Sequence, residues 1–160
     1  LSDETANGDY PLETVAAMKK VILYTQDHEP VEVLRDKITD IDNKNRDAVS
    51  VAAISLAKQL DAAVLIVETK TGATAANIAT HRPNLPIISV TSELRSAQQL
   101  ALCYANRSYV RPDDREAGYK LANELKQQGY LGENSVNVVI VSGLEPGVAG
   151  KTDNIRFCTI

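Results

Sequence analysis

This sequence has few aromatic residues, no long hydrophobic run and no cluster of basic residues, and each shortage argues against a class of protein. The longest uninterrupted apolar run is 62–67, whereas a membrane-spanning helix needs about 20 apolar residues. Aromatic residues make up only 4%, so the tyrosines are too dispersed to form a platform on which bases stack. The net charge is −4, and Lys19 and Lys20 are the only adjacent basic pair. We therefore expect no nucleic-acid partner and no membrane association.

Groups for catalysis and metal binding are also scarce. Cys103 and Cys158 lack metal-ligand spacing and a companion motif, so we expect free thiols in a reducing, cytoplasmic setting and no metal site. A disulfide or a redox switch is the alternative. His28 and His81 have no evident partner in the sequence and are expected at the surface. No nucleophile, base and orienting residue come together in residues 24–160.

The residues that are present alternate between strands and helices. The apolar patterns predict strands at 62–67, 86–91, 108–110, 136–143 and 154–160. They predict helices that start near 11 and 45, one that ends near 81, one with Leu94, Ala97, Leu100 and Ala101 on a common face, and one over 112–128. Near-continuous apolar strands between amphipathic helices indicate a mostly parallel sheet covered on both faces. The last connection contains no predicted helix, so its strand should be antiparallel. We expect an α/β fold, a three-layer sandwich with a mostly parallel five-stranded sheet whose last strand is antiparallel.

The segment 26–45 is mostly polar and contains Pro30. It is predicted to be a connection with a short helix near its middle. The shift in composition between 24 and 30 suggests a boundary between two structural units there.

A threonine-rich loop follows the first strand of the predicted sheet. Its residues are Thr69, Lys70, Thr71, Gly72, Ala73 and Thr74. Three hydroxyls, an ammonium group, a glycine and a following helix N-terminus together suit an anion such as phosphate. The spacing is not that of a nucleotide P-loop. The alternative is a turn whose threonines only cap the helix, and composition alone does not decide between the two.

A second loop follows the fourth predicted strand, between 143 and 153. It contains three glycines, Pro146, and Lys151 beside Thr152. Long glycine-containing loops in compact domains are commonly functional, although a flexible hairpin connection is the simpler alternative. Ligands of parallel sheets bind beyond the carboxyl ends of the strands. We therefore expect the two loops to form one shared site.

Three separate motifs resemble the pyruvate kinase family. The start, LSDETANGDYPLETV, is similar to the family pattern LSGETAxGxYPxEAV at the end of the last barrel strand. The segment VETKTGATAANIATHRPNLPIISVT resembles the family's phosphate-binding segment with its T-x-S-G-x-T loop, and VVIVSGLEPGVAGKTDNIR resembles its closing effector loop. The resemblance covers essentially the whole chain in the right order.

This resemblance implies a division of the chain. Residues 1–24 would be a remnant of the catalytic (β/α)8 barrel, and 25–160 the C-terminal allosteric domain. The family's catalytic residues and its Mg²⁺ and K⁺ ligands lie upstream, so we expect a fragment without activity or cofactors of its own. The start without an initiator Met agrees with that expectation. Ser2 and Glu4 match positions near the barrel mouth and would support the active site without being catalytic.

The resemblance also implies an effector site. Thr69, Thr71, Gly72 and Thr74 match positions that hold one phosphate of fructose 1,6-bisphosphate in activated members, with Lys70 as a basic neighbour. Ala73 stands where many members have arginine. In the last loop Pro146, Gly147 and Thr152 match, with Lys151 beside them, and Arg115 could reach a second phosphate.

Glu145 departs from the family, because a basic or neutral residue is more usual there and a carboxylate repels a sugar phosphate. Another phosphorylated metabolite, or an unregulated enzyme, therefore stays open. The family further implies a cytoplasmic homotetramer, with helix 92–104 and the last strand at a subunit contact. The alternatives are a freestanding phosphate-ligand module and a docking domain with a vestigial site.

Overall fold

The computed structural model describes residues 2–28, 41–145 and 147–160. The chain separates into two compact units, 1–36 and 37–160, and each is described by itself. None of the described helices combines the length and the apolar character needed to cross a membrane. The short helix predicted inside 26–45 falls largely outside the described residues.

The first unit consists of helix α1, Ser2–Ala6, and helix α2, Pro11–Asp27. Pro11 occupies the first turn of α2, where its missing N–H costs no hydrogen bond. The helix predicted from this proline is confirmed. No residue of α2 is buried, and its large apolar residues are exposed, namely Leu12, Val15, Val21, Ile22, Leu23 and Tyr24. The assignment of 1–24 to a catalytic barrel stays a prediction.

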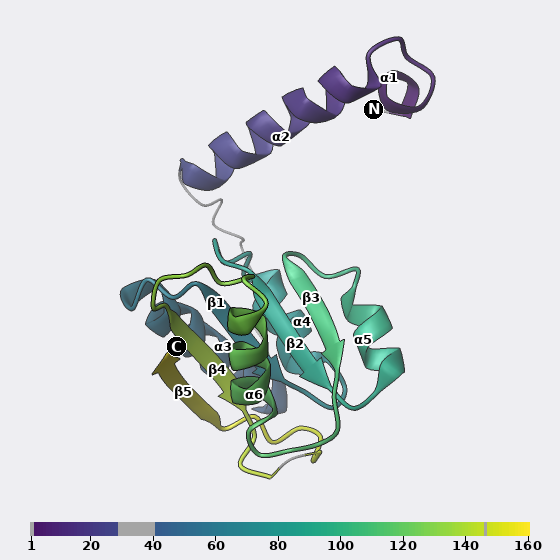
Figure 1. Cartoon of the computed structure of the whole chain (residues 1–160). Coiled ribbons are helices and arrows are strands. Elements are labelled where there is room, and N and C mark those ends of the chain that lie inside the picture. Colours follow the sequence, from purple (N-terminus) through teal and green to yellow (C-terminus); the bar gives the residue numbers. More distant parts are fainter. Residues whose placement is uncertain (1, 29–40, 146) are drawn as a thin grey trace. The chain divides into compact units, whose positions relative to one another are not determined.

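The second unit contains a five-stranded sheet (Figure 1). Its strands are β1 Val64–Glu68, β2 Ile87–Thr91, β3 Asn106–Val110, β4 Asn137–Ser142 and β5 Asn154–Thr159, in the order β3-β2-β1-β4-β5. The pairs β1–β2, β1–β4 and β2–β3 are parallel, and β4–β5 is antiparallel. The predicted α/β fold with a last antiparallel strand is confirmed.

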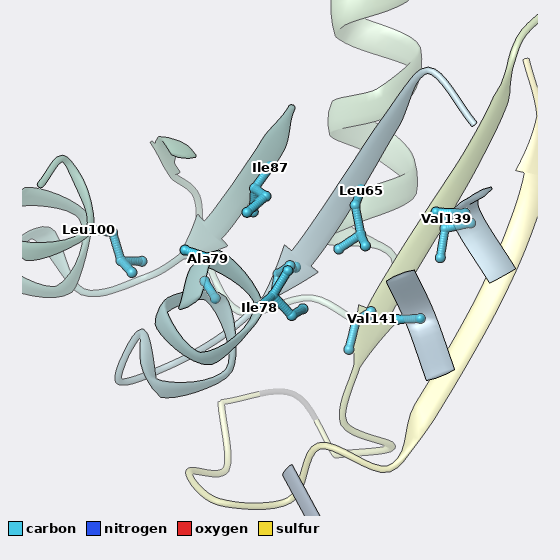
Figure 2. Packing of buried hydrophobic residues seen from close by; sticks show 11 residues of the cluster. Leu65, Ile78, Ala79, Ile87, Leu100, Val139 and Val141 are labelled. Atoms are coloured by element: carbon cyan, nitrogen blue, oxygen red, sulfur yellow. The ribbon is translucent and has the colours of Figure 1, made fainter. Parts of the chain in front are cut away.

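Helices cover both faces of this sheet. Helices α3 Ile41–Gln59, α4 Ala73–Thr80 and α5 Leu94–Leu100 pack on one face, and α6 Ala117–Gln127 packs on the other. Figure 2 shows the hydrophobic core on the face that α3, α4 and α5 cover. In this core Ile78 of α4 and Leu100 of α5 lie with Leu65, Ile87 and Val139 of the strands. The central strands β1, β2 and β4 are apolar on both faces because both faces are buried.

Several boundaries and one helix face differ from the sequence prediction. Helix α6 begins at Ala117 rather than near 112, because the Asp114 carboxylate accepts a hydrogen bond from the Glu116 amide at 2.8 Å and forms a turn instead. Helix α3 begins at residue 41 rather than near 45. Of the four residues predicted to share a face around α5, Ala97 and Leu100 are buried, whereas Leu94 is 61% exposed and Ala101, just past the helix end, is also exposed.

Helix α6 packs closely against the sheet at Gly118. A Cβ atom there would lie 2.8 Å from Glu68 Oε1 and 3.0 Å from Ile140 Cγ2. Glycine in a helix normally costs about 0.5–1 kcal/mol relative to alanine, so the close packing, rather than helix propensity, favours it here.

Gly118→Ala is therefore expected to lower the free energy of unfolding by about 1–3 kcal/mol through overpacking. Urea denaturation of the chain measures this change. Gln127→Ala, at an exposed position of the same helix, is the control and should stay within about 0.5 kcal/mol of the wild type. A Gly118→Ala protein as stable as the wild type would contradict the close packing.

Candidate functional site

One pocket lies at the edge of the sheet where the parallel strands end. It is lined by 68–71, 73–74, 111–114, 143, 145 and 147–152, together with Arg46, Val90, Ser92 and Ala117. The strands β1, β2 and β4 run in the same direction, so the loops that follow them meet at this edge. The threonine loop and the last loop thus line the same pocket.

The threonine loop is a tight turn closed by its own hydroxyls. Thr69 Oγ1 accepts a hydrogen bond from the Gly72 amide at 3.0 Å, and Thr71 Oγ1 accepts one from the Ala73 amide at 3.4 Å. Gly72 has φ = +82°, and a Cβ atom there would lie 3.2 Å from Leu100 Cγ, so this position requires glycine. The N-cap of α4 is Gly72, without a side-chain capping bond. The threonines therefore hold the turn, and Thr71 also binds the amide of the first residue of α4.

The two threonine hydroxyls remain suited to a ligand. Each oxygen accepts a bond from a backbone amide, and a hydroxyl that accepts still has its own proton to donate. Thr71 is exposed, and Thr69 is half-buried. Both lie beside the N-terminus of α4, where the helix dipole favours an anion.

A contact between hydroxyls joins the two loops. Thr74 Oγ1 lies 2.7 Å from Thr152 Oγ1, although the two residues are far apart in sequence. Thr74 is only 3% exposed, so its hydroxyl needs this partner. The contact ties the last loop to the first turn of α4.

The Lys70 ammonium group is held by acceptors from outside the threonine loop. Its Nζ lies 2.8 Å from Asp113 Oδ2, 3.1 Å from Glu93 Oε1 and 2.9 Å from Ser92 Oγ. The hydrogen bonds to Asp113 and Glu93 raise the pKa of Lys70, and Lys70 in turn lowers the pKa of Asp113. The Lys70 carbonyl accepts a hydrogen bond from Ser96 at 2.9 Å. Lys70, which was predicted to bind a phosphate, is thus already paired with the carboxylates of Asp113 and Glu93.

The last loop folds back on itself. A side chain at Gly143 would collide with the Lys151 carbonyl, so glycine is needed for this close approach. The Leu144 amide donates to Asp153 Oδ1 at 3.0 Å. Lys151 Nζ lies 3.2 Å from Glu145 Oε2, and both side chains are about 60% exposed. The basic residue predicted for this loop is therefore ion-paired as well.

Gly147 brings the last loop against the segment before α6. Its φ is +74°, and a Cβ atom there would lie 2.6 Å from Asp113 Oδ2. The Asp113 carboxylate therefore contacts the backbone of one loop while it binds Lys70 of the other. Pro146, also predicted at this site, lies outside the described residues.

A partly buried ion pair involves Glu68, one of the residues that line the pocket. Glu68 Oε1 accepts a hydrogen bond from the Gly118 amide at 2.8 Å and lies 3.8 Å from Arg156 Nη2 of β5. Burial is the main cause that raises the pKa of Glu68. The Arg156 Nε and Nη2 atoms are buried without a hydrogen-bond partner among the described residues.

The arginines that line the pocket are not the one that the sequence predicted. Arg115 is exposed and is not among the described residues that line the pocket. Arg111 does line it, and its Nη2 donates to both carboxylate oxygens of Glu124, at 2.9 and 3.0 Å. Arg46 lines it from α3. The sequence carried no local signal for Arg46 or Asp113, because their proximity depends on the tertiary fold.

Both histidines differ from the expectation that they lack partners. His81 Nε2 lies 2.9 Å from Asp47 Oδ1, and its side chain is only 17% exposed. The expectation of a surface His81 without a partner was therefore wrong. His28 is at the surface as expected, but it also has a partner, since its Nδ1 lies 2.9 Å from the Tyr24 carbonyl oxygen and its ring stacks on Tyr24. Within the part of the chain that the structure describes, no group of three or more histidine, cysteine, aspartate or glutamate side chains could hold a metal ion.

Comparison with known proteins agrees with this fold. The family model "Pyruvate kinase, alpha/beta domain" matches residues 47–158. A pyruvate kinase of Agrobacterium vitis is 35% identical over 159 residues, 98% of this chain and 34% of that protein. Pyruvate kinase 2 of a Synechocystis strain is 32% identical over 98% of the chain and 26% of its own length. A pyruvate kinase of Dictyostelium discoideum is 33% identical over the whole chain and 33% of its own length.

The chain belongs to the pyruvate kinase family, and its second unit is the C-terminal α/β domain of that family. It spans about a third of the length of the curated relatives that it matches.

The Lys70 ion pair gives the site a predictable pH dependence. Lys70 lowers the pKa of Asp113. The pair therefore stabilises the fold fully at pH values above the ordinary pKa of an aspartate. This stabilisation is lost as the pH falls through the lowered pKa of the folded state. Lys70→Met should therefore lower the melting temperature most between about pH 5 and 7, and the difference from wild type should shrink toward about pH 2.

Thermal unfolding over this pH range measures the effect. Lys58→Met removes a lysine at an exposed position of α3 and serves as the control for net charge. A Lys70→Met deficit that is the same at every pH, or one matched by Lys58→Met, would contradict the pairing.

Proposed function

We propose that this chain is the regulatory part of a pyruvate kinase, in which the pocket between the threonine loop and the last loop binds a phosphorylated effector. The whole enzyme would transfer the phosphoryl group of phosphoenolpyruvate to ADP, giving pyruvate and ATP in glycolysis. The observation that carries the proposal is the 2.7 Å contact between Thr74 and Thr152, because it joins both predicted phosphate-binding loops in one pocket.

A phosphate in this pocket would be held mainly by hydroxyl and amide groups. The hydroxyls of Thr69 and Thr71 would donate to its oxygens, and the N-terminus of α4 would add the favourable end of the helix dipole. Lys70 and Lys151 would act less directly, since each already binds a carboxylate. Binding would favour one quaternary arrangement of the enzyme, typically by about 1–3 kcal/mol of coupling.

The catalytic step would belong to the rest of the enzyme. By family membership, Mg²⁺ and K⁺ would be bound there, and the present chain would supply neither metal ligands nor catalytic residues. Ser2 and Glu4, in the first unit, would support the active site. We expect the chain alone to show no phosphoryl transfer, and turnover above a buffer control with phosphoenolpyruvate, ADP, Mg²⁺ and K⁺ would contradict this assignment.

Exposed apolar residues support a role in subunit association. Phe157 on the edge strand β5 is 57% exposed, and Leu102, just after α5, is 93% exposed. An edge strand with exposed apolar residues is a ready site for pairing with another chain. We propose that these surfaces contact other subunits of a cytoplasmic homotetramer. A whole enzyme that sediments only as a monomer at micromolar concentration would rule this out.

The ion pairs of Lys70 and Lys151 favour one further candidate, a docking domain whose effector site is vestigial. In that case the carboxylates would have replaced the ligand as the partners of the two lysines. The absence of binding of any phosphorylated ligand would favour this candidate over the effector site.

Thr71→Val tests the effector site. Thr71 is exposed, and valine keeps its shape while removing the hydroxyl proton. Loss of one hydrogen bond to a charged group, worth roughly 1.5–3 kcal/mol, should weaken phosphate-ligand binding by about tenfold or more. Calorimetric titration with fructose 6-phosphate, fructose 1,6-bisphosphate and AMP measures the change.

Thr80→Val, at the other end of α4, is the matched control. The Thr80 hydroxyl donates to the Asn77 carbonyl at 2.7 Å, outside the pocket lining, so its removal should leave affinity unchanged. If Thr71→Val lowers the melting temperature but binds every ligand as tightly as wild type, Thr71 only holds the turn and the proposed contact is wrong.

A further inference from the structure

We propose that Asn7 is a site of spontaneous covalent modification, at which the asparagine side chain cyclises onto the Gly8 amide and is converted to aspartate and isoaspartate. The site lies in the link between α1 and α2, so the proposal depends neither on the pocket nor on the proposed function. Three observations carry it: the residue that follows Asn7, the hydrogen bonding of the two residues, and their exposure.

The reaction needs only these two residues and water. The backbone nitrogen of Gly8 attacks the side-chain carbonyl carbon of Asn7, so that a new C–N bond forms and the C–N bond of the side-chain amide breaks. The proton of the Gly8 nitrogen leaves with the amide group as ammonia. Water then opens the cyclic imide at either carbonyl, which gives aspartate or isoaspartate. No oxidant or reductant takes part.

The residue after an asparagine decides how readily this ring closes. Asn7 is the only asparagine of the sequence that is followed by glycine. Glycine has no Cβ atom to obstruct the attack, and its backbone is the least restricted. The local structure also requires glycine here, because a Cβ atom at Gly8 would lie 2.8 Å from the Glu4 carbonyl oxygen.

The hydrogen bonding leaves the reacting groups free. The Asn7 backbone N–H donates to the Asp3 carbonyl at 2.9 Å, which ties the main chain of Asn7 to α1. Among the described residues, neither the Asn7 side chain nor the Gly8 N–H has a hydrogen-bond partner. The attack therefore does not have to break a hydrogen bond first, and such a loss would add to the barrier.

Both residues are also open to water. Asn7 and Gly8 are exposed and lie between the end of α1 at Ala6 and the start of α2 at Pro11. Exposed links with few contacts are the parts of a structure that change conformation most easily. The rotation that brings the side chain to the Gly8 nitrogen thus meets little resistance.

The asparagines of the second unit are held differently. Four of them donate side-chain hydrogen bonds, namely Asn77, Asn106, Asn123 and Asn137. Each of these four precedes a residue larger than glycine. Asn134 is the nearest competitor, because it is exposed and precedes the small Ser135.

The product changes the charge and the length of the link. A new carboxylate joins Asp3, Glu4 and Asp9 in the same short segment and makes the net charge more negative than its present −4. Like charges placed close together repel one another. Isoaspartate also carries the main chain through the former side chain, which alters the turn that the Asn7 N–H closes onto Asp3.

The test follows the folded chain during incubation in a mildly alkaline buffer, which favours loss of the proton from the Gly8 nitrogen. Peptide mapping by mass spectrometry detects the change from amide to acid, and methylation by an isoaspartyl methyltransferase counts isoaspartate. Conversion at Asn7 should be at least about tenfold faster than at Asn134, which corresponds to a barrier lower by about 1.4 kcal/mol.

Asn7→Gln should abolish most of the methylation signal, because the larger ring that glutamine would form closes more slowly. Asn134→Gln is the matched control and should leave the signal unchanged. Conversion no faster at Asn7 than at Asn134 would overturn the proposal, and so would a signal that persists in Asn7→Gln. Conversion at Asn7 in urea-unfolded chain but not in folded chain would also overturn it, since the fold would then shield the site.

Discussion

The parallel pairing of β1 with β2 and β4 is the constraint on which the pocket depends. Val67 of β1 is in register with Ser89 of β2 and with Val141 of β4, so the three strands end at nearly the same level. The residues that follow them must then share one edge of the sheet. A slip of one residue would exchange the faces of a strand, which the buried side chains on both faces resist.

Most of the polar side chains named at this edge of the sheet bond to one another. Thr74 binds Thr152, Lys70 binds Asp113, and Lys151 binds Glu145. These contacts connect the two loops and the segment before α6, so the pocket keeps its form through internal bonds. A ligand would compete with some of these bonds, and groups with spare donor capacity, such as Thr71, would contribute most to its binding.

The sequence predicted the fold well because its strongest signals are local. Apolar runs identify the strands, and the helix-free connection after 143 identifies the antiparallel β5. The site was less predictable because its partners are distant in sequence. Asp113 lies 43 positions after Lys70, and nothing near Lys70 indicates it. Local signals also misled: the residues from 112 resembled a helix start, but the side chain of Asp114 forms a turn there.

The central claim is that residues 69–74 and 143–153 form one phosphate-ligand pocket, and amide chemical shifts test it most directly. A ¹H–¹⁵N spectrum of the chain would be recorded during titration with fructose 6-phosphate. The account predicts saturable shifts concentrated at Thr69, Thr71, Thr74 and Thr152, with little change at the exposed edge of β3. Shifts confined to another surface, or to only one of the two loops, would contradict the shared pocket.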